Sequence, residues 1–244
     1  MRAPGHAPEN IPERGSEAVK AAIMGENSGA IRDAMLAVGV DAISCDLLPS
    51  DRPGPHYQGD MFDIIDYPWD LAIFHIPCTN TAVSGAKHFA AKWADGRQAA
   101  SVSMFMRAWK GAAHIPCVAF EHPVSIMSSL FRKPDQIVHP WMFGHGEVKA
   151  TCWWLRGLPL LVPTNPVEGR EARVHKMPPS PDRWKMRSET LPGVAAAIAA
   201  QWGGAPCATE SNIERSAEVR ASGKVRRQTL TPQSLPLSMS HTSA

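Results

Sequence analysis

The chain has 244 residues, of which 44% are hydrophobic and 20% charged, and its formal net charge is +2. This length supports one sizeable core, and the near-neutral charge neither requires nor excludes nucleic acid as a partner. No stretch has the length and apolarity of a membrane span, and the opening residues lack the apolar centre of a signal peptide. We therefore expect a cytoplasmic protein with no membrane partner. The five cysteines and ten histidines show no common ligand spacing, so no metal site is expected.

The first 125 residues alternate between short apolar runs and amphipathic stretches. The segment SGAIRDAMLAVG, for example, places Ile31, Ala34, Met35 and Val38 at helical spacing and ends on a glycine. The run WDLAIFHIPC is too continuously apolar for a sheet with one face in water. This alternation predicts an α/β fold with a mainly parallel central sheet. The expected strands cover 19–25, 40–48, 69–78 and 115–124, and the expected helices cover 28–39 and about 93–110.

The rest of the chain is less regular. One more strand is expected within KATCWWLRGL (149–158), and TLPGVAAAIAAQWG (190–203) has the pattern of a closing helix with proline in its first turn. Residues 156–187 are rich in proline, arginine and polar residues, which favours a loop. The expected organisation is a flexible lead-in at 1–18, a catalytic domain at 19–204 and a disordered tail at 205–244.

Ligands in open α/β sheets bind at the carboxyl ends of the strands, so polar residues at those ends are candidates for a site. The first strand is followed by the turn MGENSGA, whose small residues suit close approach of a ligand but equally suit a tight turn. Asp46 ends the second strand about 20 residues later, the spacing of an acid that accepts ribose hydroxyls. Asp60 is placed to accept from an exocyclic amine, although an ordinary turn aspartate explains it as well.

Two reactive side chains follow the next two strands. Cys78 comes after a buried strand, where its thiolate could attack an electrophilic carbon, although a lone cysteine is more often an inert core residue. The polar residues Thr79, Asn80 and Thr81 that follow weaken the core interpretation. Glu121 follows the apolar run CVAF and precedes a rigid His-Pro, which disfavours a simple surface acid. A thiolate and a carboxylic acid on adjacent strand ends can act on one substrate.

These residues together resemble the cytosine-5 DNA methyltransferases, and in particular their short members from phages and prophages. The resemblance covers roughly residues 20–203. PCTNTAVSG is similar to the Pro-Cys catalytic loop of that family, and EHPV is similar to its Glu-Asn-Val signature. FGHGEVKATCWWLRGLPLLVPTN and the segment from REARVHK to AAAIAAQW look like the C-terminal half of the short phage proteins.

The resemblance implies a Rossmann-like fold, S-adenosylmethionine as cofactor and double-stranded DNA with a flipped cytosine as partner. It implies that Cys78 adds to carbon 6 of cytosine while Glu121 contacts or protonates ring nitrogen 3. Carbon 5 then attacks the methyl group of the cofactor, and a base removes the carbon 5 proton. The implied cofactor contacts are Glu26, Ser28, Gly29, Asp46, Asp60 and Pro77, and the implied substrate contacts are Ser84, Lys149 and Arg173.

The sequence also departs from the family pattern. The cofactor turn is GENSGA instead of Phe-x-Gly-x-Gly, His122 replaces the Asn of Glu-Asn-Val, and no clear Gln-x-Arg-x-Arg segment is present. Lys149 and Arg173 are alternative candidates for the basic contact that the Gln-x-Arg-x-Arg segment makes in the family. A large recognition domain is absent, so the basic segment 156–187 is expected to supply DNA contact.

These departures leave two other functions open. One is modification of a pyrimidine in RNA or in free nucleotides on the same fold. The other is a degenerate relative that binds DNA or a protein without catalysis, although retention of Cys78 and Glu121 disfavours it. The leading expectation is a DNA methyltransferase of a bacterial host, phage-encoded, in a setting such as restriction-modification.

Overall fold

The computed structural model describes residues 18–204. The expected lead-in, apart from its last residue, and the expected tail lie outside the described residues. The chain divides into units 1–209 and 210–244, and every described residue belongs to the first unit.

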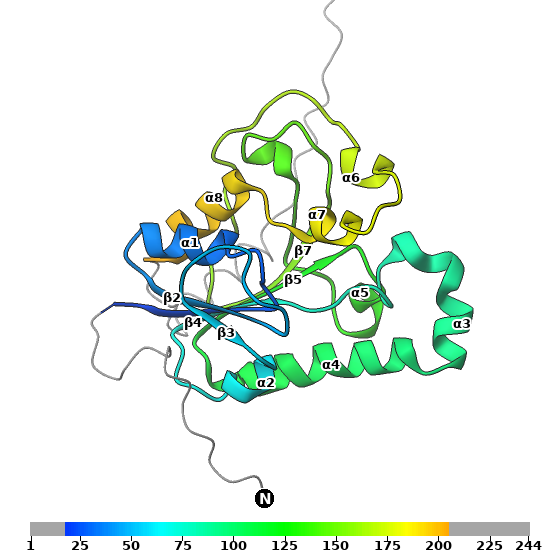
Figure 1. The fold of residues 1–244 in the computed structure, drawn as a ribbon, viewed down its shortest axis with the longest axis horizontal. Coiled ribbons are helices and arrows are strands. Elements are labelled where there is room, and N and C mark those ends of the chain that lie inside the picture. The colour runs from blue at the N-terminus through cyan, green and yellow to red at the C-terminus, as the bar shows by residue number, and fades with distance from the viewer. Residues whose placement is uncertain (1–17, 205–244) are drawn as a thin grey trace, which may run out of the picture. The chain divides into compact units, whose positions relative to one another are not determined.

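A seven-stranded mixed sheet forms the centre of this unit (Figure 1). Its order is β3 (His56–Gln58), β2 (Asp41–Asp46), β1 (Lys20–Met24), β4 (Leu71–His75), β5 (Cys117–Pro123), β7 (Thr151–Arg156) and β6 (Gln136–Val138). The first five strands in this order run parallel to one another, and β7 runs antiparallel to both β5 and β6. The structure confirms the predicted α/β class and mainly parallel sheet.

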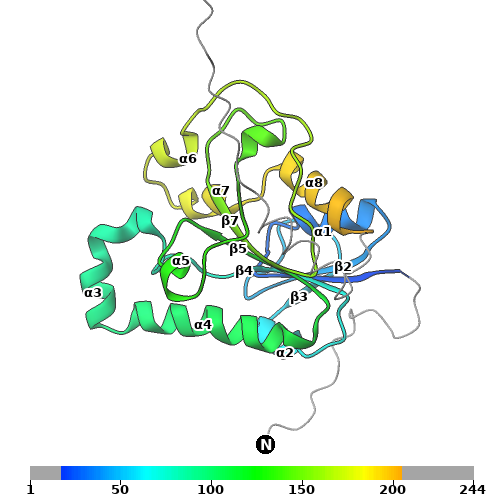
Figure 2. The same ribbon diagram turned by 180° about the vertical axis from the view of Figure 1, so that it is seen from behind.

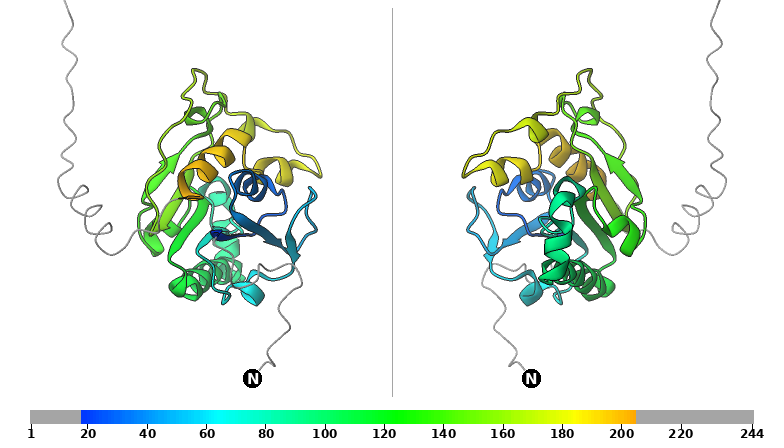
Figure 3. Two further views of the ribbon diagram at one scale, coloured as in Figure 1. Left: turned by 90° about the vertical axis from the view of Figure 1, so that its left-hand side faces the viewer. Right: turned by 90° about the vertical axis from the view of Figure 1, so that its right-hand side faces the viewer.

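Helices cover both faces of the sheet, as Figure 2 and Figure 3 show from other sides. One face is covered by α1 (Ala30–Ala37) and α8 (Pro192–Trp202), and the other by α2 (Met61–Ile64), α4 (Arg97–Gly111) and α5 (Met127–Leu130). The short α3 (Phe89–Ala94), α6 (Arg173–Lys176) and α7 (Arg183–Ser188) complete the α-helices of residues 18–204. Among these residues, no helix has the length and apolarity needed to cross a membrane.

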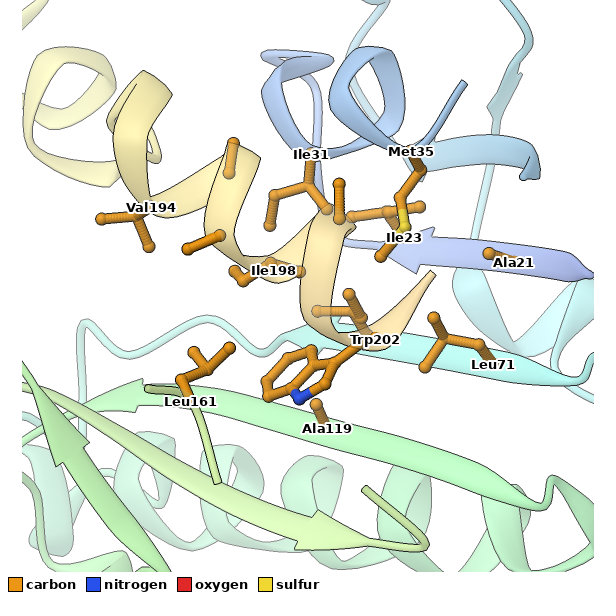
Figure 4. Close-up of a cluster of buried hydrophobic side chains, with 14 of the residues drawn as sticks. Ala21, Ile23, Ile31, Met35, Leu71, Ala119, Leu161, Val194, Ile198 and Trp202 are labelled. Atoms are coloured by element: carbon orange, nitrogen blue, oxygen red, sulfur yellow. The ribbon is translucent and has the colours of Figure 1, made fainter. Parts of the chain in front are cut away.

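Two hydrophobic cores lie on the two faces of the sheet. Along β1, Ala21 and Ile23 join the core beneath α1 and α8, whereas Ala22 and Met24 join the opposite core. This alternation follows from the two-residue period of a strand buried on both faces. Figure 4 shows the first core, where the ring of Trp202 lies among aliphatic side chains from the sheet and both helices. Complete burial of one of these aliphatic side chains contributes about 1.5–3 kcal/mol to stability.

The structure also corrects several predicted elements. The helix expected over 93–110 is two helices, because Gly96 takes a left-handed φ of 80° between α3 and α4. Strands β3 and β6 lie in segments without a periodic signal and were not predicted. The segment 156–187 is not entirely loop, since it contains α6 and α7.

Candidate functional site

A cavity of about 720 Å³ opens at the carboxyl ends of β1, β2, β4 and β5. Its far wall comes from α6 and α7, which lie on the α1 and α8 side of the sheet (Figure 1 and Figure 2). The structure therefore brings most of the predicted site residues into one space. The predicted residues that line it are Glu26, Ser28, Asp46, Asp60, Pro77, Cys78, Ser84, Glu121 and Lys149.

Two predicted site residues do not line this cavity. Gly29 has a φ of 70°, and a Cβ atom there would lie 2.4 Å from the guanidinium of Arg32. The backbone conformation and the close guanidinium therefore explain why this position is glycine. This is the tight-turn interpretation of the segment. Arg173 forms an ion pair of 2.8 Å with Glu147 outside the cavity, whereas Lys149 lines the cavity.

The turn after β1 is organised by Glu26. This buried carboxylate accepts hydrogen bonds from the backbone N–H groups of Ile31 (2.8 Å) and Arg32 (3.2 Å) at the start of α1. It thereby satisfies donors that the first helical turn leaves unpaired. Gly25 has a φ of 77°, and a Cβ there would meet the carbonyl oxygen of His75 at 2.2 Å. The turn can therefore approach β4 closely only with glycine at this position.

Asp46 and Asp60 line the cavity from two neighbouring segments. Asp46 ends β2, and its Oδ1 atom accepts from the N–H of Leu48 at 2.9 Å. Asp60 begins α2, and its Oδ1 atom accepts from the N–H of Phe62 at 3.0 Å. The two segments are joined because the N–H of Gly59 donates to the Asp46 carbonyl at 2.9 Å. Each carboxylate is oriented by one local bond and retains acceptor capacity for a ligand.

The loop that carries Cys78 is fixed by hydrogen bonds on both sides. The Cys78 carbonyl accepts from the N–H groups of Thr81 (3.0 Å) and Ala82 (2.9 Å), which closes a turn. The next carbonyl, that of Thr79, accepts from Lys92 Nζ at 2.5 Å. Lys92 is a buried lysine of α3, so the amino group is held under the loop. A rigid framework of this kind holds a reactive side chain in one position.

Cys78 and Glu121 face the same cavity with opposite pKa shifts. Burial and the charge of Glu121 raise the pKa of the Cys78 thiol above its ordinary value. For Glu121, burial works against the charged form, but a hydrogen bond and charge from His75, with Lys149, hold the pKa below its ordinary value. Without a ligand, the site therefore holds a thiol beside a carboxylate.

The basic segment is largely paired within the protein. Arg156 donates to the carbonyls of Ala112 and Ile115, and Arg183 donates to a carbonyl of its own segment. Lys185 of α7 forms an ion pair of 2.6 Å with Asp51. Arg187 lines the cavity and contributes positive potential at Cys78. This segment therefore forms one wall of the cavity as well as a basic surface.

Most other residues that line the cavity were not predicted, and His75 and Trp184 are two of them. His75 ends β4, and its Nδ1 atom lies 3.4 Å from Glu121 Oε2. Trp184 comes from α7, as does Arg187 of the segment expected to contact DNA. His75 could have been predicted from its position at the end of a strand, because the rule that ligands bind at strand ends also identified Glu121. No local pattern indicated α7, which is held by contacts distant in sequence.

No group of three or more His, Cys, Asp or Glu side chains able to hold a metal ion occurs among residues 18–204. No protein-family model matches the sequence, and no curated protein matches it significantly.

Proposed function

We propose that the protein is an S-adenosylmethionine-dependent methyltransferase that acts on carbon 5 of cytosine in DNA. The observation that carries this proposal is the single cavity shared by Cys78, Glu121 and the two acids Asp46 and Asp60. A nucleophile and an acid at one end, with ribose and amine acceptors at the other, match the two reactants of such a transfer. The mixed, mainly parallel sheet is compatible with the Rossmann-like fold of these enzymes.

The cofactor is proposed to lie over the ends of β1 and β2. In this pose Asp46 accepts hydrogen bonds from the ribose hydroxyls, and Asp60 accepts from the adenine amine. The sulfonium of the cofactor is a cation, and carboxylates along this edge favour it over a neutral molecule. Glu26 acts indirectly, since its carboxylate already caps α1, and it shapes the turn that faces the methionine part. The bound cofactor supplies an electrophilic methyl group.

The pyrimidine is proposed to enter between the ends of β4 and β5. The Cys78 thiol passes its proton to the Glu121 carboxylate, and Sγ bonds to carbon 6 while Glu121 gives this proton to ring nitrogen 3. The electron pair thus placed at carbon 5 attacks the methyl group and releases the demethylated cofactor as a neutral thioether. Solvent water takes the carbon 5 proton, Cys78 leaves as its thiolate, and Glu121 takes back the proton of ring nitrogen 3, which restores the aromatic ring. Lys149 and Arg187 lower the pKa of Cys78, which assists formation of the thiolate against the effect of burial.

A duplex is the proposed substrate because the cavity accepts a base only after that base leaves the stack. The exposed side chains at its mouth include Trp184, Val83 and Leu47. An exposed indole ring is suited to stack on a nucleobase, and cations beside it suit phosphates. Lys185 and Arg187 on α7 place such charges next to Trp184.

A duplex that contains 5-fluorocytosine tests this proposal. Fluorine at carbon 5 cannot leave as a proton, so the adduct with Cys78 should persist and be seen as a DNA-linked species in denaturing gels. Formation should require S-adenosylmethionine and should be lost in Cys78→Ser. Adduct formation only with an RNA duplex or a free nucleotide would replace DNA as the substrate. No adduct with any pyrimidine substrate would contradict the proposal.

A further inference from the structure

Glu121 and His75 are paired by the architecture of the sheet. They are register partners on the adjacent parallel strands β5 and β4. Residues paired in this way project from the same face of the sheet. Their neighbours Phe74 and Phe120 belong to the core beneath α4. His75 and Glu121 therefore project toward the opposite side, where the wall from α6 and α7 closes the cavity.

The contact between the two side chains is specific and partly shielded from solvent. His75 Nδ1 lies 3.4 Å from Glu121 Oε2, and the two side chains are 15% and 20% exposed. An ionised carboxylate can only accept, so Nδ1 must be the donor. The other ring nitrogen, Nε2, is buried without a hydrogen-bond partner among residues 18–204. No second bond to the described part of the chain therefore competes for the orientation of this ring.

The two cations predicted to contact the substrate are bonded elsewhere. Arg173 pairs with Glu147, and Lys149 Nζ donates to the carbonyl of Glu189 at 3.4 Å. Lys149 still acts on Glu121 through its charge. Among the described residues, His75 is the side chain with a hydrogen bond to the Glu121 carboxylate.

We infer that His75 is the positioning residue for Glu121. It binds Oε2 through Nδ1–H, which leaves Oε1 directed to the pyrimidine. This inference rests on the proposed function and assigns the partner of its acid. In the reaction one proton passes from Glu121 Oε1 to ring nitrogen 3 as Sγ bonds to carbon 6. The Nδ1–H of His75 then stabilises the carboxylate that remains, without itself being transferred.

Substitution of His75 tests its effect on the reaction. His75→Leu removes the donor, whereas His75→Asn retains an N–H group at the position of Nδ1. Loss of a hydrogen bond to a charged group corresponds to about a tenfold to hundredfold loss of single-turnover rate. We expect this loss in His75→Leu, with unchanged dissociation constants for cofactor and DNA, and substantial recovery in His75→Asn. His88→Leu, an exposed residue outside the cavity, is the control and should match wild type.

Wild-type rates in His75→Leu would overturn the inference. Equal losses in His75→Leu and His75→Asn would also overturn it, because they would show that the N–H donor at this position does not affect the rate. Urea unfolding of each variant separates a rate effect from loss of the fold.

A second measurement does not depend on methyl transfer. The Nδ1 resonance of the His75 ring is compared by NMR in wild type and in Glu121→Gln at one pH. The contact predicts that this resonance moves in Glu121→Gln, because the hydrogen bond to a carboxylate is replaced by a weaker one to an amide. Identical spectra would overturn the pairing even if the protein methylates DNA. Conversely, a clear shift in a protein that methylates no substrate would retain the pairing and reject the proposed function.

Discussion

His122 and Thr81 are joined by a hydrogen bond of 2.7 Å that ties strand β5 to the loop of Cys78. Thr81 Oγ1 in turn donates to the Cys78 carbonyl at 3.3 Å. Burial lowers the pKa of His122, so the ring is neutral near pH 7, and its Nε2–H is assigned as the donor to Thr81. Histidine thus forms the link between the acid-bearing strand and the thiol-bearing loop.

Replacing this histidine should loosen that link. His122→Leu fills the space of the ring with an apolar side chain but leaves the buried Thr81 hydroxyl without this donor. We expect a loss of about 1–3 kcal/mol in the free energy of unfolding, measured with urea. Transfer should slow while cofactor affinity is retained, since the cofactor acids lie on other strands. Full stability and full rate in His122→Leu would show that the link has no role.

Lys92 should control the mobility of the thiol loop. Lys92→Met retains most of the buried stem but removes the bond to the Thr79 carbonyl, so Cys78 should react faster with iodoacetamide. Lys87→Met, an exposed lysine of the 3-10 helix before α3, is the matched control and should leave the rate unchanged. Mass spectrometry assigns the label to Cys78 against the buried Cys45 and Cys152. Equal alkylation rates in the two variants would disprove this role for Lys92.

The charge of Glu121 should affect the pH at which Cys78 becomes reactive. Because burial and this charge raise the pKa of Cys78, its thiolate should accumulate only as the pH rises above the usual range of a thiol. Glu121→Gln removes the charge, so the pH midpoint of Cys78 alkylation should move to lower values. An unchanged or higher midpoint would show that the two side chains do not interact.

The two acids at the cofactor end should contribute to affinity. Asp46→Asn keeps the Oδ1 acceptor for Leu48 but loses the charge that strengthens bonds to hydroxyl donors. We expect the dissociation constant of S-adenosylmethionine, measured by calorimetry, to rise about tenfold to a hundredfold. Asp66→Asn, an exposed acid outside the cavity, should bind as wild type does. An unchanged constant in Asp46→Asn would remove Asp46 from the cofactor site.

The parts of the site that sequence predicted are those set by the ends of strands. Asp46, Cys78 and Glu121 each follow an apolar run, and parallel strands bring such ends to one edge. This rule needs only the order of elements, so no distant contact had to be known. Gly29 lies outside the lining of the cavity, and its φ of 70° and the close guanidinium of Arg32 account for glycine there.

The wall of the cavity was not predictable in the same way. Helix α7 has six residues and no apolar periodicity. Two ion pairs hold it in place, Lys185 with Asp51 at 2.6 Å and Glu189 with Arg52 at 3.0 Å. The partners in these two pairs are 134 and 137 positions apart in the chain. Local patterns contain no information about contacts of this kind, and exposed charges alone indicated a loop.

Transfer of labelled methyl from S-adenosylmethionine to unmethylated duplex DNA tests the proposed function most directly. Wild type, Cys78→Ser and Cys45→Ser are compared. The Cys45 thiol also lines the cavity, but burial and the nearby acids raise its pKa to about 12, so it serves as the control thiol. We predict label on carbon 5 of cytosine with wild type and Cys45→Ser, and none with Cys78→Ser. Label on cytosine with Cys78→Ser at the wild-type rate, or no label with wild type, would contradict the proposal.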